Sequence, residues 1–159
     1  MKKLLITLCI LSLTGFGIAK ADDFYEPSTE AKLQYNQGVD YYKIGQYDRS
    51  MSSFWQAIAI DRNYIDAYYN LGLILEYLKQ NDTALAIFKQ IIVRNPTDYE
   101  SVYKAADLSV KLNELDKAKS YLSLIPPEST VYSKAQSLAN SMNTDMQTIK
   151  TQEDKVAKT

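Results

Sequence analysis

Apolar residues recur in short blocks along this chain, and the clearest block lies between Asp66 and Pro96. The residues within it are spaced three or four positions apart, which is the spacing of one face of an α-helix. The block reads Tyr68-x-x-Leu71-Gly72-x-x-Leu75, then Ala84-x-x-x-Phe88. In the preceding block Gly45 is expected to end a helix over 31–44, and a second helix is predicted from Gln46 to about Ile60.

The same pattern returns at a constant interval of 34 residues. Gly38 lies 34 residues before Gly72, and Ala106 lies the same distance after it. Four further columns keep this interval: Tyr35, Tyr69 and Tyr103; Asp48, Asp82 and Asp116; Ser50, Ala84 and Ala118; Phe54, Phe88 and Leu122. Agreement at so many positions predicts three copies of one helical hairpin.

Each column has a structural explanation. The aspartates suit the positively charged start of a helix, because the helix dipole favours negative charge there. Gly38 and Gly72, facing the small residues of the third column, allow the two helices of a hairpin to approach closely. The large residues of the last column fill the space between neighbouring hairpins, and Trp55, one position further on, is expected to pack in the same way.

The residues of the central block resemble the signature of the tetratricopeptide repeat, in which two short antiparallel helices form one 34-residue unit. The large residue, Leu-Gly, Ala, aromatic residue and Pro all fall at that family's offsets. The resemblance implies an all-α fold, a right-handed superhelical solenoid of three helix-turn-helix repeats with a final capping helix. Gln34 and Gln37 occupy usually apolar positions, and Ala105-Ala106 replaces Leu-Gly in the third repeat.

These observations divide the chain into segments. Residues 22–30 form an N-terminal lead-in, and the repeats are placed at 31–64, 65–98 and 99–129. Pro126-Pro127 ends the third repeat early, and apolar residues at helical spacing predict a capping helix over 130–142. The tail, residues 143–159, is polar and without apolar periodicity, so we expect it to be disordered.

Residues 1–21 have the composition of an export signal. Lys2 and Lys3 precede an apolar run, and Ala19-Lys20-Ala21 offers small residues for cleavage. We therefore expect an exported bacterial protein, periplasmic or secreted, that is not inserted in a membrane after cleavage; an uncleaved anchor is the alternative. Cleavage removes Cys9, the only cysteine, which excludes disulfides and thiolate chemistry. Three lysines and no acidic residue leave with the signal, so the formal charge changes from −1 to −4, which disfavours nucleic acid as a partner.

Few residues offer catalytic chemistry. The chain contains no histidine and no glycine-rich phosphate loop, so histidine-based nucleophile pairs and metal sites are excluded. Glu76 and Asp107 remain as a possible carboxylate pair, although charges on a helix face are usually solvated. We predict a protein that is not an enzyme and that carries no cofactor or metal, with a carboxylate hydrolase as a remote alternative.

In the tetratricopeptide family the first helices of successive repeats line a concave groove, and the resemblance assigns fixed positions of each repeat to it. Carried onto this chain, the groove residues are Lys32, Tyr35, Val39, Tyr42, Lys43, Asp66, Tyr69, Leu73, Glu76, Tyr77, Glu100, Tyr103, Asp107, Val110 and Lys111. Tyrosine combines a broad apolar surface with a hydroxyl and is enriched in binding surfaces. Tyr35, Tyr69 and Tyr103 are expected to form one column; the alternative is that they pack against adjacent helices.

Charges on these positions change sign along the array. The first repeat contributes two lysines, and the later repeats contribute mostly acids. We therefore expect a ligand whose acidic part lies near Lys32 and Lys43 and whose basic part lies beyond them. The five-residue carboxylate clamp of cochaperone repeats is not supported, because only Asn70 and Lys104 match it.

Together these arguments predict a protein–protein interaction module of the bacterial cell envelope, which binds another protein or peptide in the groove as scaffold or adaptor. The alternative is a self-associating subunit of an envelope assembly, because a short repeat array can stack end to end.

Overall fold

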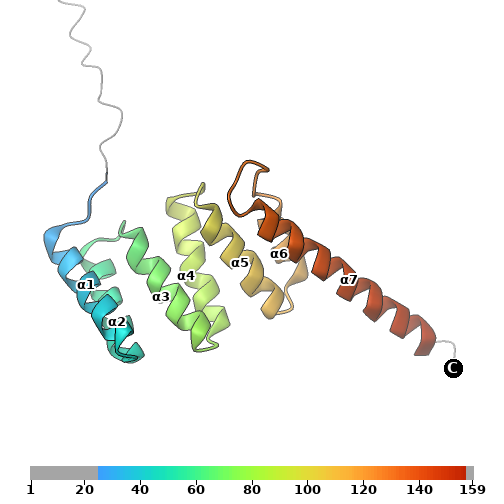
Figure 1. The fold of residues 1–159 in the computed structure, drawn as a ribbon, viewed down its shortest axis with the longest axis horizontal. Helices are drawn as coiled ribbons and strands as arrows, with labels where there is room; N and C mark the ends of the chain where they lie inside the picture. Colours follow the sequence, from blue (N-terminus) through green and yellow to red (C-terminus); the bar gives the residue numbers. More distant parts are fainter. Residues whose placement is uncertain (1–24, 157–159) are drawn as a thin grey trace, which may run out of the picture.

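The computed structural model describes residues 25–156, with the side chains of the last helix described to Thr144 and at Gln147. The predicted signal, residues 1–21, and the beginning of the predicted lead-in lie outside the described residues. Seven helices form the described part of the chain. They are α1 (Thr29–Lys43), α2 (Tyr47–Ile60), α3 (Ile65–Tyr77), α4 (Asn81–Arg94), α5 (Tyr99–Lys111), α6 (Leu115–Leu122) and α7 (Tyr132–Val156) (Figure 1).

The helix ends follow local sequence signals. Ser28 caps α1 by accepting a hydrogen bond from the Ala31 amide at 3.2 Å, and Asp98 caps α5 by accepting one from the Ser101 amide at 3.1 Å. The second residue after each first helix has a positive φ, and these residues also keep the 34-residue interval: Gly45 (73°), Lys79 (62°) and Asn113 (60°). A left-handed residue at this point closes the helix by a tight reversal, so the hairpins share one turn geometry.

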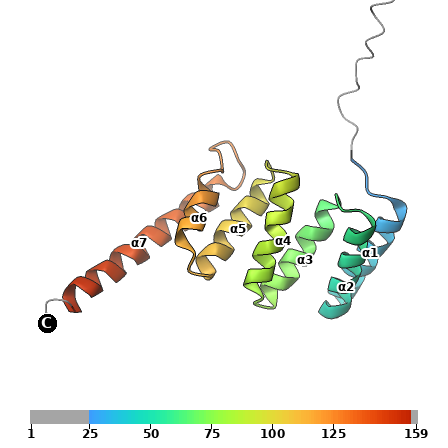
Figure 2. The ribbon, with the colours of Figure 1, turned by 180° about the vertical axis from the view of Figure 1, so that it is seen from behind.

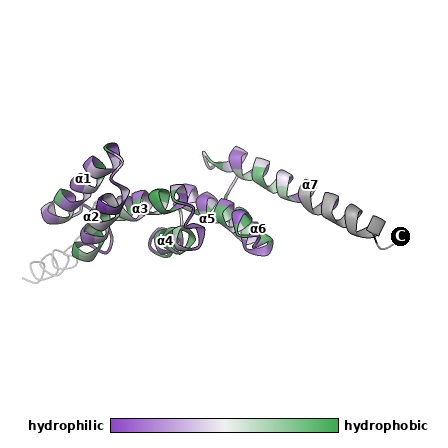
Figure 3. Cartoon of the chain, turned by 90° about the horizontal axis from the view of Figure 1, so that it is seen from below, coloured by the Kyte–Doolittle hydropathy of each residue, from purple (hydrophilic) through white to green (hydrophobic). Residues whose placement is uncertain are grey.

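The helices pair into three hairpins that stack in sequence order. Contacts join α1 with α2, α3 with α4 and α5 with α6, while α2 packs on α3 and α4 packs on α5. Seen from below, α1 and α3 lie on the side opposite α2 and α4, and each of these helices carries both hydrophilic and hydrophobic residues (Figure 3). The chain is thus an all-α solenoid of helical hairpins, as the sequence predicts.

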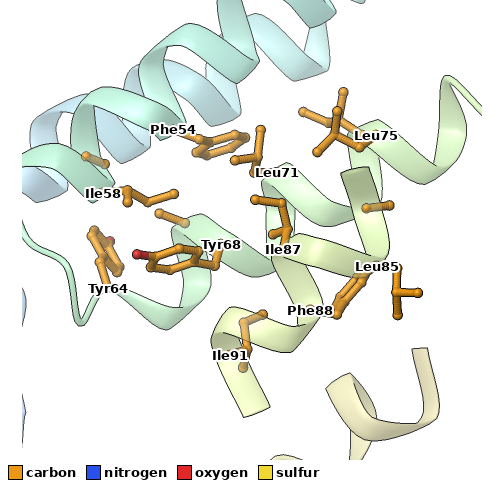
Figure 4. Close-up of a cluster of buried hydrophobic side chains, with 14 of the residues drawn as sticks. Phe54, Ile58, Tyr64, Tyr68, Leu71, Leu75, Leu85, Ile87, Phe88 and Ile91 are labelled. Carbon is orange, nitrogen blue, oxygen red and sulfur yellow. The ribbon is translucent and has the colours of Figure 1, made fainter. Parts of the chain in front are cut away.

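The core runs along the interface between the two sides. Phe54 and Phe88 are almost fully buried among Leu71, Ile87 and their neighbours (Figure 4). A Cβ atom added to Gly38 would lie 2.8 Å from the Phe54 ring, and one added to Gly72 would lie 2.9 Å from the Phe88 ring. The predicted close approach at these two glycines is therefore present.

The C-terminal end differs from the prediction. The last helix begins at Tyr132 and continues to Val156, well past the expected end at 142, so most of the segment expected to be disordered is helical. No glycine or proline follows Pro127, and a helix already anchored by packing lengthens without a new nucleation step. Figures 1 and 2 show α7 extending beyond the stack.

The first turns of α7 close the open end of the third hairpin. Val131, Ala135 and Met142 are buried, and Val131 and Ala135 form a second apolar cluster with Val102 and Ile125. The predicted capping role is thus present over the first turns of α7, up to Met142. Trp55, by contrast, is 47% exposed, so the expectation that it packs between hairpins is wrong. Over residues 25–156, no helix combines the length and the apolar character needed to cross a membrane.

Candidate functional site

The predicted groove residues all lie on α1, α3 or α5, and none of them is buried. Tyr42 and Tyr77 are the most open of the tyrosines, at 51% and 63% exposure, and Tyr35, Tyr69 and Tyr103 are half-buried. The first helices therefore share one accessible face. Whether this face binds a ligand remains a prediction.

The first hollow in this face lies between α1 and α3 and is called the aromatic cavity below. It has a volume of about 300 Å³. Its lining consists of Tyr35, Val39, Tyr42, Phe54, Asn70, Leu73 and Ile74. Asn70 is the main polar group, and its Nδ2 already donates to the Tyr35 hydroxyl at 2.8 Å. The remaining wall is mainly apolar, apart from the tyrosine hydroxyls, so the cavity suits an apolar side chain.

The second hollow adjoins the first and is called the lysine cavity below. It has a volume of about 630 Å³. Its lining consists of Tyr42, Leu73, Glu76, Tyr77, Lys79, Asn81, Lys104 and Lys111. Because Tyr42 and Leu73 line both hollows, the two are adjacent on the first helices, and together they are called the groove below.

An ion-pair network crosses from α3 to α5 at the lysine cavity. Glu76 accepts from Lys104 at 2.9 Å and from Lys111 at 2.6 Å, and Lys111 also reaches Asp107 at 2.7 Å. Burial alone would raise the pKa of Glu76, but the hydrogen bonds from Lys111 and Lys104 lower it below its usual range. The Glu76 carboxylate is thus ionised and occupied, which is unsuited to a catalytic acid or base.

The three column tyrosines have different surroundings, and within the described structure their rings do not contact one another. Tyr35 packs on Phe54 and Tyr64, with centroids 5.5 and 4.9 Å apart. Tyr69 meets Phe88 edge-on at 5.6 Å. One side of the Tyr35 ring and one side of the Tyr69 ring therefore pack against neighbouring helices, as the alternative interpretation of the sequence expects. Of the column tyrosines, only Tyr35 lines the groove formed by the two cavities.

Tyr103 faces the last helix instead. It lines a separate hollow of about 430 Å³ together with Ser133, Lys134, Ser137, Leu138 and Ser141 of α7. The Lys134 ammonium lies 6.0 Å from the centre of the Tyr103 ring, close enough for a cation–π contact. Helix α7 thus lies along the third-repeat end of the predicted groove.

The predicted charge polarity does not correspond to the groove lining. Lys32 pairs with Glu26, and Lys43 pairs with Asp40 at 3.0 Å; neither lysine lines either cavity. Of the acids of the later repeats, Glu76 and Asp107 are already paired with lysines, and Asp66 lines neither cavity. Asn70 and Lys104, the two clamp-like residues, are likewise held by Tyr35 and Glu76.

Several residues of the groove escaped the sequence reasoning. Phe54 and Ile74 form apolar wall, and Lys79 and Asn81 line the lysine cavity. Lys79 and Asn81 follow the end of α3, outside the helix positions that the family resemblance assigns. Gly45, Lys79 and Asn113 share a positive φ at the 34-residue interval, but of these three only Lys79 lines the groove. In the described part of the chain, no group of acidic, cysteine or histidine residues is arranged to hold a metal ion.

A stack of helical hairpins with two adjoining hollows on its first helices defines a helical-repeat protein. Two sequence models match the chain, one described as a TPR repeat over residues 38–81 and one as a tetratricopeptide repeat over residues 75–141. Together they extend over more than half of the 159 residues. The chain belongs to the tetratricopeptide repeat family.

Curated relatives match only through such repeats. The chain is 27% identical over 74 residues to the probable peptide N-acetylglucosaminyltransferase SPINDLY of Oryza sativa subsp. japonica. The matched stretch covers 45% of this chain and 8% of that enzyme. It is 27% identical over 79 residues to human tetratricopeptide repeat protein 28, which covers 50% of this chain and 3% of that protein. The chain spans less than a tenth of the length of either relative.

Solved structures share the fold. The type III secretion chaperone SycD of Yersinia enterocolitica, in complex with a peptide of the translocator YopD, is 18% identical with a TM-score of 0.66, over 75% of this chain and 96% of that one. MamA is 22% identical with a TM-score of 0.57, over 73% and 62% of the two chains. The second repeat domain of Spaghetti (RPAP3), bound to an HSP90 peptide, is 18% identical with a TM-score of 0.56, over 60% and 89%.

Proposed function

We propose that this protein is a non-enzymatic adaptor of the bacterial cell envelope that binds a polypeptide segment in the groove of its first helices. The observation that carries the proposal is the pair of adjoining cavities that share Tyr42 and Leu73. Proteins of the same fold support it, since SycD is seen with a peptide of YopD and PcrH with the chaperone binding region of PopD. The ionised, lysine-bound Glu76 argues against hydrolysis by carboxylates.

A photo-crosslinking residue placed in the groove tests this proposal. The groove position is Tyr42 and the matched control is Trp55, because the two are similarly exposed, at 51% and 47%, and Trp55 lines neither cavity. In envelope extracts we expect position 42 to crosslink to a polypeptide and position 55 to give none. The Val39→Phe substitution, which fills the aromatic cavity, should abolish the crosslink. Equal crosslinking at both positions would contradict a groove-based function.

Export is the second part of the proposal, and it rests on the composition of residues 1–21. A C-terminally tagged chain expressed in a bacterium should be found in the periplasmic fraction, with Asp22 as its first residue. Deletion of 2–21 should leave it in the cytoplasm. A chain that keeps Met1 in the membrane fraction would instead identify an uncleaved anchor.

The open end of the first hairpin favours self-association as a second candidate function. Leu33 and Ile44 of this end are 64% and 65% exposed, whereas Ala67 and Ser101, one and two repeats after Leu33, are fully buried. A second copy could cover this face by an antiparallel contact of two α1 helices centred on Gln37, which places Leu33 near Tyr41 of the other copy. Sedimentation over a concentration series should then show a dimer that Leu33→Glu removes, and a monomer at every concentration would eliminate the candidate.

A further inference from the structure

The two halves of the groove differ in chemistry. The aromatic cavity has seven lining residues, and its main polar group, Asn70, is already hydrogen-bonded to Tyr35. A ligand carboxylate or ammonium placed there would lose water and meet only the neutral groups of Asn70 and the tyrosine hydroxyls, with no opposite charge, which is unfavourable. An aliphatic or aromatic side chain would instead gain contact with Val39, Leu73 and the tyrosine rings.

The lysine cavity carries an excess of positive charge. Three lysines and one carboxylate line it. Glu76 is shared by Lys104 and Lys111, and Asp107 provides the second carboxylate for Lys111. Lys79 has no ion pair among the described residues and is exposed. One positive charge therefore remains unmatched beside the apolar half of the groove, at a position where a carboxylate side chain would be favoured.

We infer that the groove selects a segment carrying an apolar side chain for the aromatic cavity and, close to it in sequence, an acidic side chain for the lysine cavity. This inference rests on the proposed function and states which polypeptides the groove accepts. It reverses the polarity expected from the sequence, because the acidic part of the ligand lies beside the second and third repeats instead of the first. The acidic group is an internal side chain: Tyr35, Val39 and Glu100 stand where a terminal carboxylate clamp needs lysine or asparagine.

The steps of recognition follow from this arrangement. The apolar side chain displaces water from the aromatic cavity and contributes most of the affinity, since buried apolar anchors dominate such interfaces. The acidic side chain accepts hydrogen bonds from the ammonium groups of Lys79 and Lys111. The Lys111 side chain is 41% exposed despite its two carboxylate partners, so its ammonium can donate to a ligand. Its contribution is therefore smaller and sensitive to salt, as expected for a solvent-exposed ion pair.

A random peptide library selected on the full chain tests this inference without knowledge of the natural partner. Enriched peptides are synthesised in two forms, with an amidated and with a free C-terminus, and their affinities are measured by fluorescence anisotropy. We expect enriched sequences to contain Leu, Ile, Phe or Tyr next to Asp or Glu, and the two forms to bind equally. Tighter binding of the free acid alone would mean that a terminal carboxylate is recognised, and it would overturn the inference.

Three variants separate the two halves of the site. Lys79→Glu should weaken the enriched peptides by about three- to tenfold at low salt and less at high salt. The matched control Lys89→Glu, an exposed lysine of α4 that lines neither cavity, should change affinity by less than about twofold. Val39→Phe should abolish binding while circular dichroism verifies that the chain is folded.

The outcomes distinguish this inference from the proposed function. If Val39→Phe abolishes binding but Lys79→Glu has no effect, or if the enriched peptides are basic, the groove binds peptides and the acidic preference is wrong. If no peptide is enriched, or if the enriched peptides bind all variants equally, the proposed function itself fails.

Discussion

The contact between Gly72 and Phe88 gives the sharpest prediction about stability. A Cβ atom at Gly72 would lie 2.9 Å from two carbon atoms of the Phe88 ring, well inside the 3.4 Å of an ordinary contact. The ring is fully buried and meets Tyr69 edge-on, so it cannot swing away freely. The Gly72→Ala substitution should therefore force α3 and α4 apart.

Two opposing effects determine the magnitude. Alanine in place of glycine within a helix gains about 1 kcal/mol from backbone propensity. Overpacking a well-packed core costs about 1–3 kcal/mol. The steric effect prevails here because the obstacle is a buried ring and not the end of a flexible side chain. We expect Gly72→Ala to lower the free energy of unfolding by up to about 2 kcal/mol.

The third repeat suggests the compensating change, because Ala106 and Leu122 occupy the positions of Gly72 and Phe88. Phe88→Leu alone should destabilise by about 1–2 kcal/mol through lost volume. The double variant should be more stable than the sum of the single changes by about 1 kcal/mol or more.

Urea unfolding followed by circular dichroism measures all three variants against the parent chain. Asn36→Ala, at an exposed position of α1, is the control for helix propensity. The reasoning is refuted if Gly72→Ala gains the full propensity benefit of about 1 kcal/mol, or if the cycle is additive within about 0.5 kcal/mol.

Three further predictions concern other parts of the fold. Lys79→Gly should raise the urea midpoint and increase the free energy of unfolding by up to about 1 kcal/mol, because a lysine with a φ of 62° carries left-handed strain. A lower midpoint would show that the turn depends on the lysine side chain. Because the pKa of Glu76 is lowered in the folded state, its contribution to stability is complete above its usual pKa of 4.5 and is lost as the pH falls below it. Glu76→Gln should flatten the acid limb of stability against pH, and an unchanged limb would contradict the ion-pair network. A chain ended after Ser129 should lose several kcal/mol by exposing Val102 and Ile125, at about 1.5–3 kcal/mol for each side chain, whereas one ended after Asn143 should unfold at nearly the parent temperature.

Much of the fold could be predicted from the sequence because its cause is periodic. The 34-residue interval places Gly38 and Gly72 against Phe54 and Phe88, so one column of residues predicts the packing of two hairpins. The positions that the family resemblance assigns to the groove all lie on the first helices, and none of them is buried. Periodicity fails at the two ends, where a hairpin lacks one neighbour. Exposed Leu33 and the long helix α7 are both end effects.

The chemistry of the groove was less predictable, because it depends on contacts between repeats. Glu76 and Lys111 are 35 residues apart and meet only because α3 and α5 are adjacent in the stack. The sign of each charge is visible in the sequence, but its pairing is not. A ligand polarity predicted from the signs alone therefore treats every charge as free. Likewise Lys79 belongs to the groove through the turn that follows α3, which no helix-based assignment includes.

Methyl NMR of the full chain titrated with one library-selected peptide tests the central claim most directly. The claim is that a polypeptide lies across α1, α3 and α5, with Val39 and Leu73 beneath it. We expect the methyl signals of Val39 and Leu73 to shift in proportion to bound peptide, while those of Val93 and Leu124, which are 76% and 56% exposed and line neither cavity, remain in place. Shifts at Val93 or Leu124 with none at Val39 and Leu73 would place the ligand elsewhere and contradict the account.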